Sequence, residues 1–189
     1  MSAIAEGTQL TTPRLLLRPF RPDDRDAFAR FVADPAYRRY LGPEHPALDE
    51  FMANNLAIDW QREHSWVICM TGQVVGSIFL GVDALDLTAE IACLLAPSAW
   101  GQGIAGEAGR ALADYAFTKL NVRKVHARAD ASNAASRRAM DKAGMRPEDA
   151  VPNDSDAASE RVDEVAYTLT RERWEAERTG EPPDATANL

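Results

Sequence analysis

A glycine-rich turn at residues 100–106, with the sequence Trp-Gly-Gln-Gly-Ile-Ala-Gly, constrains this chain more than any other stretch. Residues 89–96 before the turn are apolar apart from one carboxylate and end at Pro97, as expected of a buried strand. Residues 107–120 after the turn place apolar side chains at helical spacing. The turn is therefore predicted to join a core strand to the start of a helix.

The start of a helix is a favourable place for a negatively charged ligand. Its first turn exposes backbone N–H groups and carries the positive end of the helix dipole, about half an elementary charge. Glycines allow a phosphate to approach these N–H groups closely. Three small residues in a first helical turn also lower helix stability, which disfavours a turn that binds nothing. We therefore predict that this turn binds a diphosphate.

Two diphosphate ligands fit this turn, and the residues alone leave both open. Gly101, Gly103 and Gly106 match the GxGxxG fingerprint of dinucleotide-binding folds, and Asp130 lies near the distance expected of the ribose-binding acid. Against a dinucleotide, residues 97–100 separate the strand from the turn, and only about 80 residues follow, too few for a doubly wound sheet. The other ligand is an acyl-coenzyme A.

Composition restricts the partners of the chain. Its 189 residues are 46% hydrophobic, enough for the core of one domain. The net charge of −8 disfavours a nucleic-acid partner, which requires a basic face. The chain has no apolar run of membrane-span length and no signal-peptide segment, so we expect a cytoplasmic protein without a membrane partner. Cys69 and Cys93 lie in apolar runs without metal-like spacing, which predicts reduced core cysteines and no metal.

The rest of the chain predicts strands and helices around this turn. Expected strands cover residues 10–20, 65–70, 74–82, 89–96, 123–130 and 162–170, and expected helices cover 22–34, 48–62, 107–120, 132–144 and 170–178. Short links make the strands between 65 and 96 antiparallel, and the helix that follows makes the next strand parallel. A flexible leader at 1–9, one domain at 10–178 and a disordered tail at 179–189 are expected, with a long acidic loop at 147–160.

The histidine and tryptophan side chains are predicted to have structural positions rather than catalytic roles. The three histidines, His45, His64 and His126, are predicted to lie at the surface rather than to act in catalysis. The aromatic rings of Trp60, Trp66 and Trp174 are predicted to lie in the core.

With this order of elements the chain resembles the N-acetyltransferases of the GNAT superfamily and, within it, the RimJ/RimL group of ribosomal-protein N-terminal acetyltransferases. The resemblance covers about residues 10–175. It rests on three motifs in order: Thr12-Pro13-Arg14-Leu15 with Leu17-Arg18, Pro97-x-x-Trp100-Gly101-Gln102-Gly103-Ile104-Ala105-x-Glu107-Ala108, and Asn133-x-x-Ser136 with Lys142-x-Gly144. It implies an α+β fold, with a mixed, mostly antiparallel sheet, a βαβ core that binds acyl-coenzyme A, and helices on both faces.

The resemblance also implies acetyl-coenzyme A as the co-substrate. Its diphosphate would be held by the backbone N–H groups of Gln102, Gly103, Ile104, Ala105 and Gly106. Its pantetheine arm would pair with the end of the preceding strand, at Cys93, Leu94 and Leu95, where that strand separates from its neighbour. One of these N–H groups could polarise the thioester carbonyl. Asn133 would contact the pantetheine, cap its helix, or do both.

The implied reaction is direct transfer of an acetyl group to a primary amine, either a protein N-terminus or a small-molecule amine. A protonated amine must first lose a proton, and Glu90 is the candidate base because it is the only ionisable group in its apolar strand. The alternative is an exposed Glu90 without a role. Ser136 is the candidate proton donor to the thiolate, since many relatives use a tyrosine where this chain has Met140; a helix-start hydrogen bond is the alternative for Ser136.

Further alternatives stay open at this point. One is a GNAT-fold module that binds acyl-coenzyme A without turnover, and a more distant one is a dinucleotide-dependent oxidoreductase. The acidic residues between 148 and 164 would form either an electrostatic funnel for a cationic acceptor or a solvated loop. Arg137, Arg138 and Lys142 would meet either the ribose phosphate of the coenzyme or only water. The resemblance suggests a homodimer, and the residues do not name the acceptor.

Overall fold

The computed structural model describes residues 8–39, 41, 45–60, 63–148 and 164–180. Its strands are β1 Leu10–Thr11, β2 Leu15–Arg18, β3 Glu63–Met70, β4 Gln73–Asp83, β5 Thr88–Leu95, β6 Lys124–Asp130, β7 Arg146–Pro147 and β8 Glu164–Thr170. Its α-helices are α1 Arg25–Ala33, α2 Pro35–Arg38, α3 Leu48–Leu56, α4 Ile104–Tyr115, α5 Ala134–Lys142 and α6 Arg171–Thr179. Short 3₁₀ turns cover Pro22–Asp24 and Pro97–Ala99, and a π-helical turn continues α4 over Ala116–Leu120.

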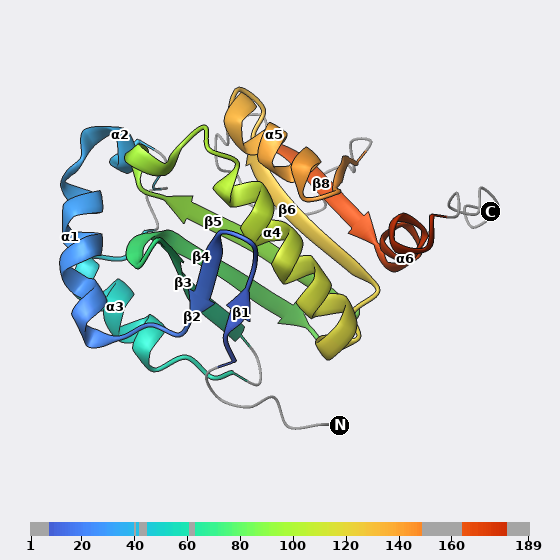
Figure 1. Cartoon of the computed structure of the whole chain (residues 1–189), viewed down its shortest axis with the longest axis horizontal. Helices are drawn as coiled ribbons and strands as arrows, with labels where there is room; N and C mark the ends of the chain where they lie inside the picture. The colour runs from blue at the N-terminus through green and yellow to red at the C-terminus, as the bar shows by residue number, and fades with distance from the viewer. Residues whose placement is uncertain (1–7, 40, 42–44, 61–62, 149–163, 181–189) are drawn as a thin grey trace, which may run out of the picture.

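One mixed sheet forms the centre of the molecule, with the strand order β1-β2-β3-β4-β5-β6-β8-β7. Neighbouring strands are antiparallel except for β5 and β6, which are parallel. Helix α4 crosses one face of the sheet. Helices α1 and α3 lie together at the left-hand end of the sheet in Figure 1, away from α6. The α+β class and the directions of the strands from β3 to β6 are therefore as predicted.

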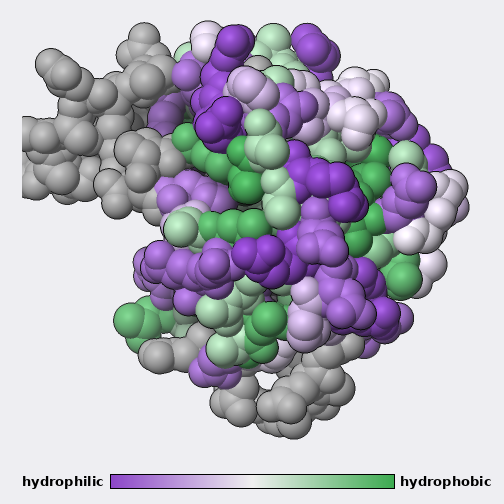
Figure 2. All heavy atoms as spheres, turned by 90° about the vertical axis from the view of Figure 1, so that its left-hand side faces the viewer, coloured by the Kyte–Doolittle hydropathy of each residue, from purple (hydrophilic) through white to green (hydrophobic). Residues whose placement is uncertain are grey.

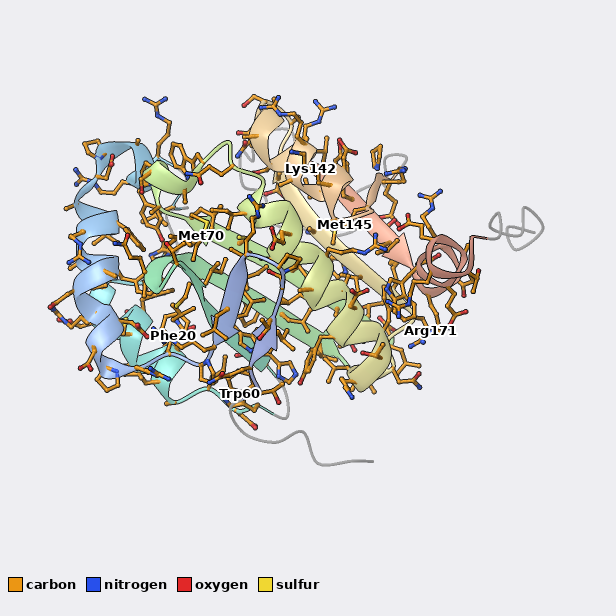
Figure 3. The ribbon with its side chains drawn as sticks, viewed as in Figure 1. Phe20, Trp60, Met70, Lys142, Met145 and Arg171 are labelled. Carbon is orange, nitrogen blue, oxygen red and sulfur yellow. The ribbon has the colours of Figure 1, made fainter. Side chains whose placement is uncertain are left out.

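Two apolar clusters hold the helices against the sheet. The larger lies beneath α4 and includes Trp66, Ile78, Leu80, Leu112 and Leu169. The smaller lies on the α1 and α3 side and includes Phe20, Phe28, Met52 and Val67. Figure 3 shows Phe20 on the α1 side of the sheet and Met145 beside α4. Alternate residues of a strand point to opposite faces, so β3 supplies side chains to both clusters.

The prediction of a single strand over residues 10–20 is wrong, because the chain turns back within this range. β1 and β2 form a short antiparallel hairpin instead of one strand over residues 10–20. Thr12 closes the turn: its N–H donates to the carbonyl of Leu15 at 2.9 Å, and its hydroxyl accepts from the N–H of Leu15 at 2.9 Å. Pro13 lies in the turn, where the lack of an N–H costs no ladder hydrogen bond.

Other boundaries also differ from the predictions. The helix expected over 48–62 ends at Leu56. Helix α2 forms between the two expected helices at 22–34 and 48–62, because the Asp34 side chain caps it by accepting from the Ala36 N–H at 2.8 Å. The short strand β7 begins the stretch expected to be an acidic loop, and α6 extends to Thr179, where the tail was expected. Residues 1–7, 149–163 and 181–189 lie outside the described residues, and with them most of the predicted leader, acidic loop and tail.

Candidate active site

Strands β5 and β6 are paired only where they begin. Their parallel register consists of Thr88 with Lys124, Ala89 with Val125 and Glu90 with His126. Beyond that point β5 remains paired with β4 as far as Leu95, but the described part of β6 forms no further pairs with it. One edge of residues 91–95 therefore presents backbone N–H and C=O groups to an open fork, where an extended ligand can pair as a strand would.

The start of α4 lies just beyond the end of β5. Gly101 and Gly103 have φ angles of +74° and +77°, a region that glycine adopts without strain. Gly103 is the N-cap and supplies no capping side chain, and the first backbone hydrogen bond of the helix runs from the Glu107 N–H to the Gly103 carbonyl at 3.1 Å. The N–H groups of residues 104–106 therefore point out of the helix start uncapped, as an anion site requires.

Gly106 has a different reason to be glycine. A Cβ atom there would lie 2.7 Å from the Cβ of Lys142 and 3.2 Å from the carbonyl oxygen of Ala139. The missing side chain therefore allows α4 and α5 to pack closely, and Figure 3 shows Lys142 at this contact. The same packing brings positive charge to the helix start: a Cβ on Gly103 would lie 3.7 Å from both Lys142 Nζ and Arg14 Nη2.

Glu107 connects the β1–β2 turn to the start of α4. Its carboxylate accepts hydrogen bonds from the Thr12 hydroxyl at 2.5 Å, from the Arg14 N–H at 3.1 Å and from Arg14 Nε at 2.6 Å. Arg14 Nη1 also donates to the carbonyl of Gln102 at 3.0 Å. Burial would raise the pKa of Glu107, but the bonds from Thr12 and Arg14 outweigh it and lower that pKa. A cavity of about 520 Å³ lies along this contact, bounded by Arg14, Gly103 and Lys142.

The sequence reasoning missed this contact. Both partners belong to motifs that carried the resemblance, the Thr12-Pro13-Arg14 turn and the glycine-rich turn with Glu107. Because Thr12 and Glu107 are 95 residues apart, no local pattern relates them.

Asn133 and Ser136 lie together at the start of α5, which follows the carboxyl end of β6. Asn133 is the N-cap, and its side-chain oxygen accepts from the Ser136 N–H at 3.0 Å. The capping role considered for Asn133 is therefore present. No hydrogen bond of the Ser136 hydroxyl is found within the described residues, and Met140, one turn later, is buried. The hydroxyl is therefore one polar group of this helix start that remains available to a ligand.

Glu90 lies where β5 and β6 separate. Its neighbours Ala89 and Ile91 belong to the core beneath α4, so the Glu90 carboxylate lies on the opposite face of the sheet, half exposed. His126 Nε2 is 4.0 Å from Glu90 Oε2. Both line a cavity of about 760 Å³ together with Phe79, Gly81, Val82, Thr88 and the carboxylates of Asp59, Glu63 and Asp83.

The glycine-rich turn, the end of β5 and the start of α5 thus gather at one end of the sheet, and Glu90 lies at the closed end of the fork. Figure 2, which looks onto the α1 side, shows hydrophobic surface between hydrophilic ridges. This side of the molecule therefore carries both apolar and charged surface.

His64 contradicts its predicted place at the surface. It is 1% exposed and packs against Trp60, Trp66 and Tyr115, with ring-centroid distances of 5.6, 5.7 and 5.7 Å. Neither of its ring nitrogens has a hydrogen-bond partner within the described residues, and burial lowers the pKa of His64 to about 4. The signal was the alternation of His64, Trp66 and Ile68, which places all three on the core face of β3.

The cysteines and tryptophans lie as predicted. Cys69 is buried and Cys93 partly buried, and neither forms a disulfide. Burial raises the pKa of the Cys93 thiol to about 12, so it is protonated at neutral pH and is a poor nucleophile. Trp66 and Trp174 are buried, and Trp60 packs against the larger cluster.

The residues considered for other ligands have structural roles. The Asp130 carboxylate accepts from the Ser132 N–H at 2.7 Å, as in an Asx turn, and the mostly antiparallel sheet is not a doubly wound dinucleotide fold. Within the described part of the chain, no group of three His, Cys, Asp or Glu side chains is arranged to hold a metal ion. No helix among those residues is both long enough and apolar enough to cross a bilayer.

Comparison with known proteins places this geometry in one family. The family model described as an acetyltransferase (GNAT) domain matches residues 14–146. The chain is 27% identical over 173 residues to the uncharacterised N-acetyltransferase p20 of Bacillus licheniformis, covering 87% of this chain and 97% of the relative. It is 34% identical over 182 residues to the FsC-acetyl coenzyme A-N(2)-transacetylase of Aspergillus fumigatus, covering 87% of this chain and 77% of the relative.

A solved structure agrees with the sequence relatives. RimJ of Mycobacterium smegmatis, in complex with CoA-disulfide, is similar with a TM-score of 0.71 and 22% identity, over 93% of this chain and 94% of that one. At this level of identity the comparison shows a shared fold.

Proposed function

This chain belongs to the GNAT acetyltransferase family, and from that premise we propose that it transfers the acetyl group of acetyl-coenzyme A to a primary amine in a ternary complex. The observation that carries the proposal is the fork between β5 and β6, with the uncapped start of α4 just beyond the end of β5. These two features supply what a diphosphate and an extended amide-containing arm require.

The residues of the fork fit this co-substrate. The N–H groups of residues 102–106 would hold the diphosphate, with Arg14 and Lys142 adding positive charge beside Gly103. The edge of β5 that does not pair with β6, at Cys93, Leu94 and Leu95, would pair with the pantetheine arm; at its end the Leu95 carbonyl accepts a hydrogen bond from Trp100 Nε1 at 2.9 Å. When bound, acetyl-coenzyme A supplies an activated acyl group. A β5 N–H would stabilise negative charge on the carbonyl oxygen during attack by the amine.

Two side chains are proposed to manage protons. Glu90 at the fork would assist the loss of a proton from the acceptor ammonium, since only the neutral amine has a lone pair for attack. The Ser136 hydroxyl would donate to the departing thiolate, a modest contribution because a thiol pKa of about 8.5 already makes it a fair leaving group. Asn133 would hold the start of α5 in place for Ser136 through the hydrogen bond described above.

The acceptor is proposed to be a primary amine, either a peptide N-terminus or a small molecule. The cavity beside Glu90 is lined by the carboxylates of Asp59, Glu63 and Asp83, which favour an ammonium over a neutral or anionic group. Two of the proteins similar to this chain carry names that specify transfer to nitrogen, p20 and the FsC-acetyl coenzyme A-N(2)-transacetylase.

Binding and turnover test this proposal separately. Because Trp100 is the first residue of the glycine-rich turn, its fluorescence should change on titration with acetyl-coenzyme A and not with NAD. Thiol release should then require an amine from a panel of polyamines, amino sugars and short peptides with free N-termini. Saturable binding of NAD would contradict the proposed ligand. Binding of acetyl-coenzyme A without thiol release for any amine would favour the binding module without turnover.

A further inference from the structure

We propose that His126 is a catalytic residue that accepts the proton of the acceptor ammonium, with the Glu90 carboxylate beside it stabilising the imidazolium that forms. This inference rests on the proposed acetyl transfer. It assigns to a histidine the role that the sequence reasoning gave to Glu90 alone, and to Glu90 the role of its charge partner.

The geometry places His126 at the right point. It is the partner of Glu90 in the last pair of the β5–β6 register, so the two side chains lie side by side where the fork opens. His126 Nε2 is 4.0 Å from Glu90 Oε2, within the range of a charge interaction and one small side-chain movement from a hydrogen bond. Both residues line the cavity of about 760 Å³ that would admit the amine. The imidazole keeps 23% of its side-chain surface exposed, so it is accessible there.

Charges on β5, on its own strand β6 and at Glu148 act on His126, whereas its partner on β8 is the uncharged Thr168. Burial lowers its pKa, Glu90 on β5 opposes that effect, and Arg128 and Lys124 on its own strand lower the pKa further. Glu148 raises it weakly and pairs with Lys124 at 3.1 Å. Asp59, Glu63 and Asp83 line the same cavity. The balance keeps the imidazole neutral at neutral pH, which is the form that can accept a proton.

A histidine suits this step better than an exposed carboxylate. General-base catalysis is most effective when the pKa of the base lies near the working pH. Glu90 is half exposed, and water that stabilises its carboxylate charge makes it a weaker base for an ammonium proton. A neutral imidazole next to a carboxylate holds it better, because the imidazolium is formed beside a negative charge.

The acceptor ammonium gives one proton to His126, which becomes an imidazolium, and the neutral amine then attacks the thioester carbonyl carbon. The C–N bond forms, the C–S bond breaks, and the second nitrogen proton passes to the leaving thiolate, by way of Ser136 or water. The imidazolium returns its proton to solvent, so the products are the amide, the free thiol and one proton.

The first test is a pH profile of kcat with the best amine of the panel. In the wild type, kcat should fall as the pH drops through the His126 pKa, below about 6.5. His126→Gln should lower kcat at pH 7.5 by about 100-fold and remove that acid limb, with the Kd of acetyl-coenzyme A unchanged. His45→Gln is the matched control, since His45 contacts Pro46 and Phe51 and is not among the described residues that line the cavity beside Glu90; it should keep both kcat and the limb.

Two charge variants identify the titrating group. Glu90→Gln removes the carboxylate that favours the imidazolium, so the acid limb should move to lower pH. Arg128→Gln removes a repelling cation, so the limb should move to higher pH. If Glu90 itself were the titrating base, Glu90→Gln would abolish the limb instead of shifting it, and the inference would be overturned.

Ring N–H correlation spectra give a readout that does not depend on turnover. The chain has three histidines, and His126→Gln assigns the signal of His126. Its pKa should fall in Glu90→Gln and rise in Arg128→Gln; an unchanged pKa in Glu90→Gln would overturn the pairing. Failure of the wild type to bind acetyl-coenzyme A would refute the proposed function. If the wild type is active and His126→Gln has the same kcat, only the inference about His126 is refuted.

Discussion

The buried imidazole of His64 links a single side chain to the pH dependence of folding. It is packed among aromatic rings beneath α4 without a hydrogen-bond partner in the described residues, and its pKa falls to about 4. The unfolded chain returns it to a pKa of about 6.5. The folded state therefore binds fewer protons than the unfolded state between these values. Its contribution to stability is complete above pH 6.5 and is lost as the pH falls toward 4.

The variant His64→Leu should remove this sensitivity. In the wild type, His64 should lower the free energy of unfolding by about 2 kcal/mol between pH 7.5 and pH 5. In the variant that part of the loss should disappear, so the variant should be the more stable protein at pH 5. Urea unfolding at both pH values measures the difference, and His45→Leu serves as a control. Equal acid losses in the wild type and His64→Leu would contradict the buried neutral histidine.

At the scale of elements, the start of α4 combines a backbone conformation with a charge arrangement. Gly101 and Gly103 both have positive φ angles, but their surroundings differ. Apart from its two chain neighbours, no described residue has an atom within 4 Å of a Cβ built on Gly101, whereas a Cβ on Gly103 meets Arg14 and Lys142. The two positions therefore separate backbone strain from ligand binding.

Substituting the two glycines makes that separation measurable. Gly101→Ala and Gly103→Ala should each lower stability by about 1 kcal/mol, because alanine is strained at positive φ. Only Gly103→Ala should also weaken acetyl-coenzyme A binding, by at least about tenfold, since its methyl group would lie beside the uncapped N–H groups at the start of α4. Calorimetric titration measures the affinity and thermal unfolding the stability. Equal affinities in the two variants would contradict the proposed anion site.

Helices α4 and α5 provide a second matched pair. Gly106→Ala should lower stability by about 1–3 kcal/mol, because its Cβ would lie 2.7 Å from the Cβ of Lys142 and the helices must separate. Gly109→Ala should be nearly neutral: its Cβ meets Ala143 Cβ at 3.3 Å, a milder crowding that the higher helix propensity of alanine offsets. Denaturant unfolding of both variants checks the order, and a more harmful Gly109→Ala would contradict this packing.

Patterns among residues close in sequence predicted the structural elements that residues close in sequence determine. The β3–β4 hairpin follows from alternation and a tight turn in which Thr71 and Gly72 have φ angles of 49° and 81°. The α4 start follows from the glycines. The Glu107 contact with Thr12 and Arg14 and the position of His126 beside Glu90 could not be predicted, because both depend on register between distant segments. The surface position predicted for His64 is wrong, because its alternation with Trp66 places it on the core face of β3.

At the scale of the whole molecule, the fork divides the sheet into two parts. On one side of it β1 to β5 form a continuous antiparallel sheet, and on the other β6, β7 and β8 form a smaller one. The two are joined by three residue pairs and by α4, which crosses the fork in Figure 1. A ligand that pairs with β5 inside the fork would therefore add contacts between the two parts.

Hydrogen exchange should detect this effect. Acetyl-coenzyme A at 100 times its Kd should raise the free energy of unfolding by about 2.7 kcal/mol. Locally, it should slow exchange of the fork-facing amides among residues 91–95 beyond that global effect. Amides shared by β3 and β4 should show the global slowing alone. Uniform slowing without an excess in β5 would contradict pantetheine pairing along this strand.

The unpaired edge of β5 also exposes the protein to a hazard. Main-chain donors and acceptors in a row do not distinguish a coenzyme arm from a stretch of another polypeptide, and sheet edges of this kind are where chains join into aggregates. When a ligand occupies the fork, these backbone groups of β5 are no longer exposed. Coenzyme A in the purification buffer is therefore expected to keep concentrated samples monodisperse for longer.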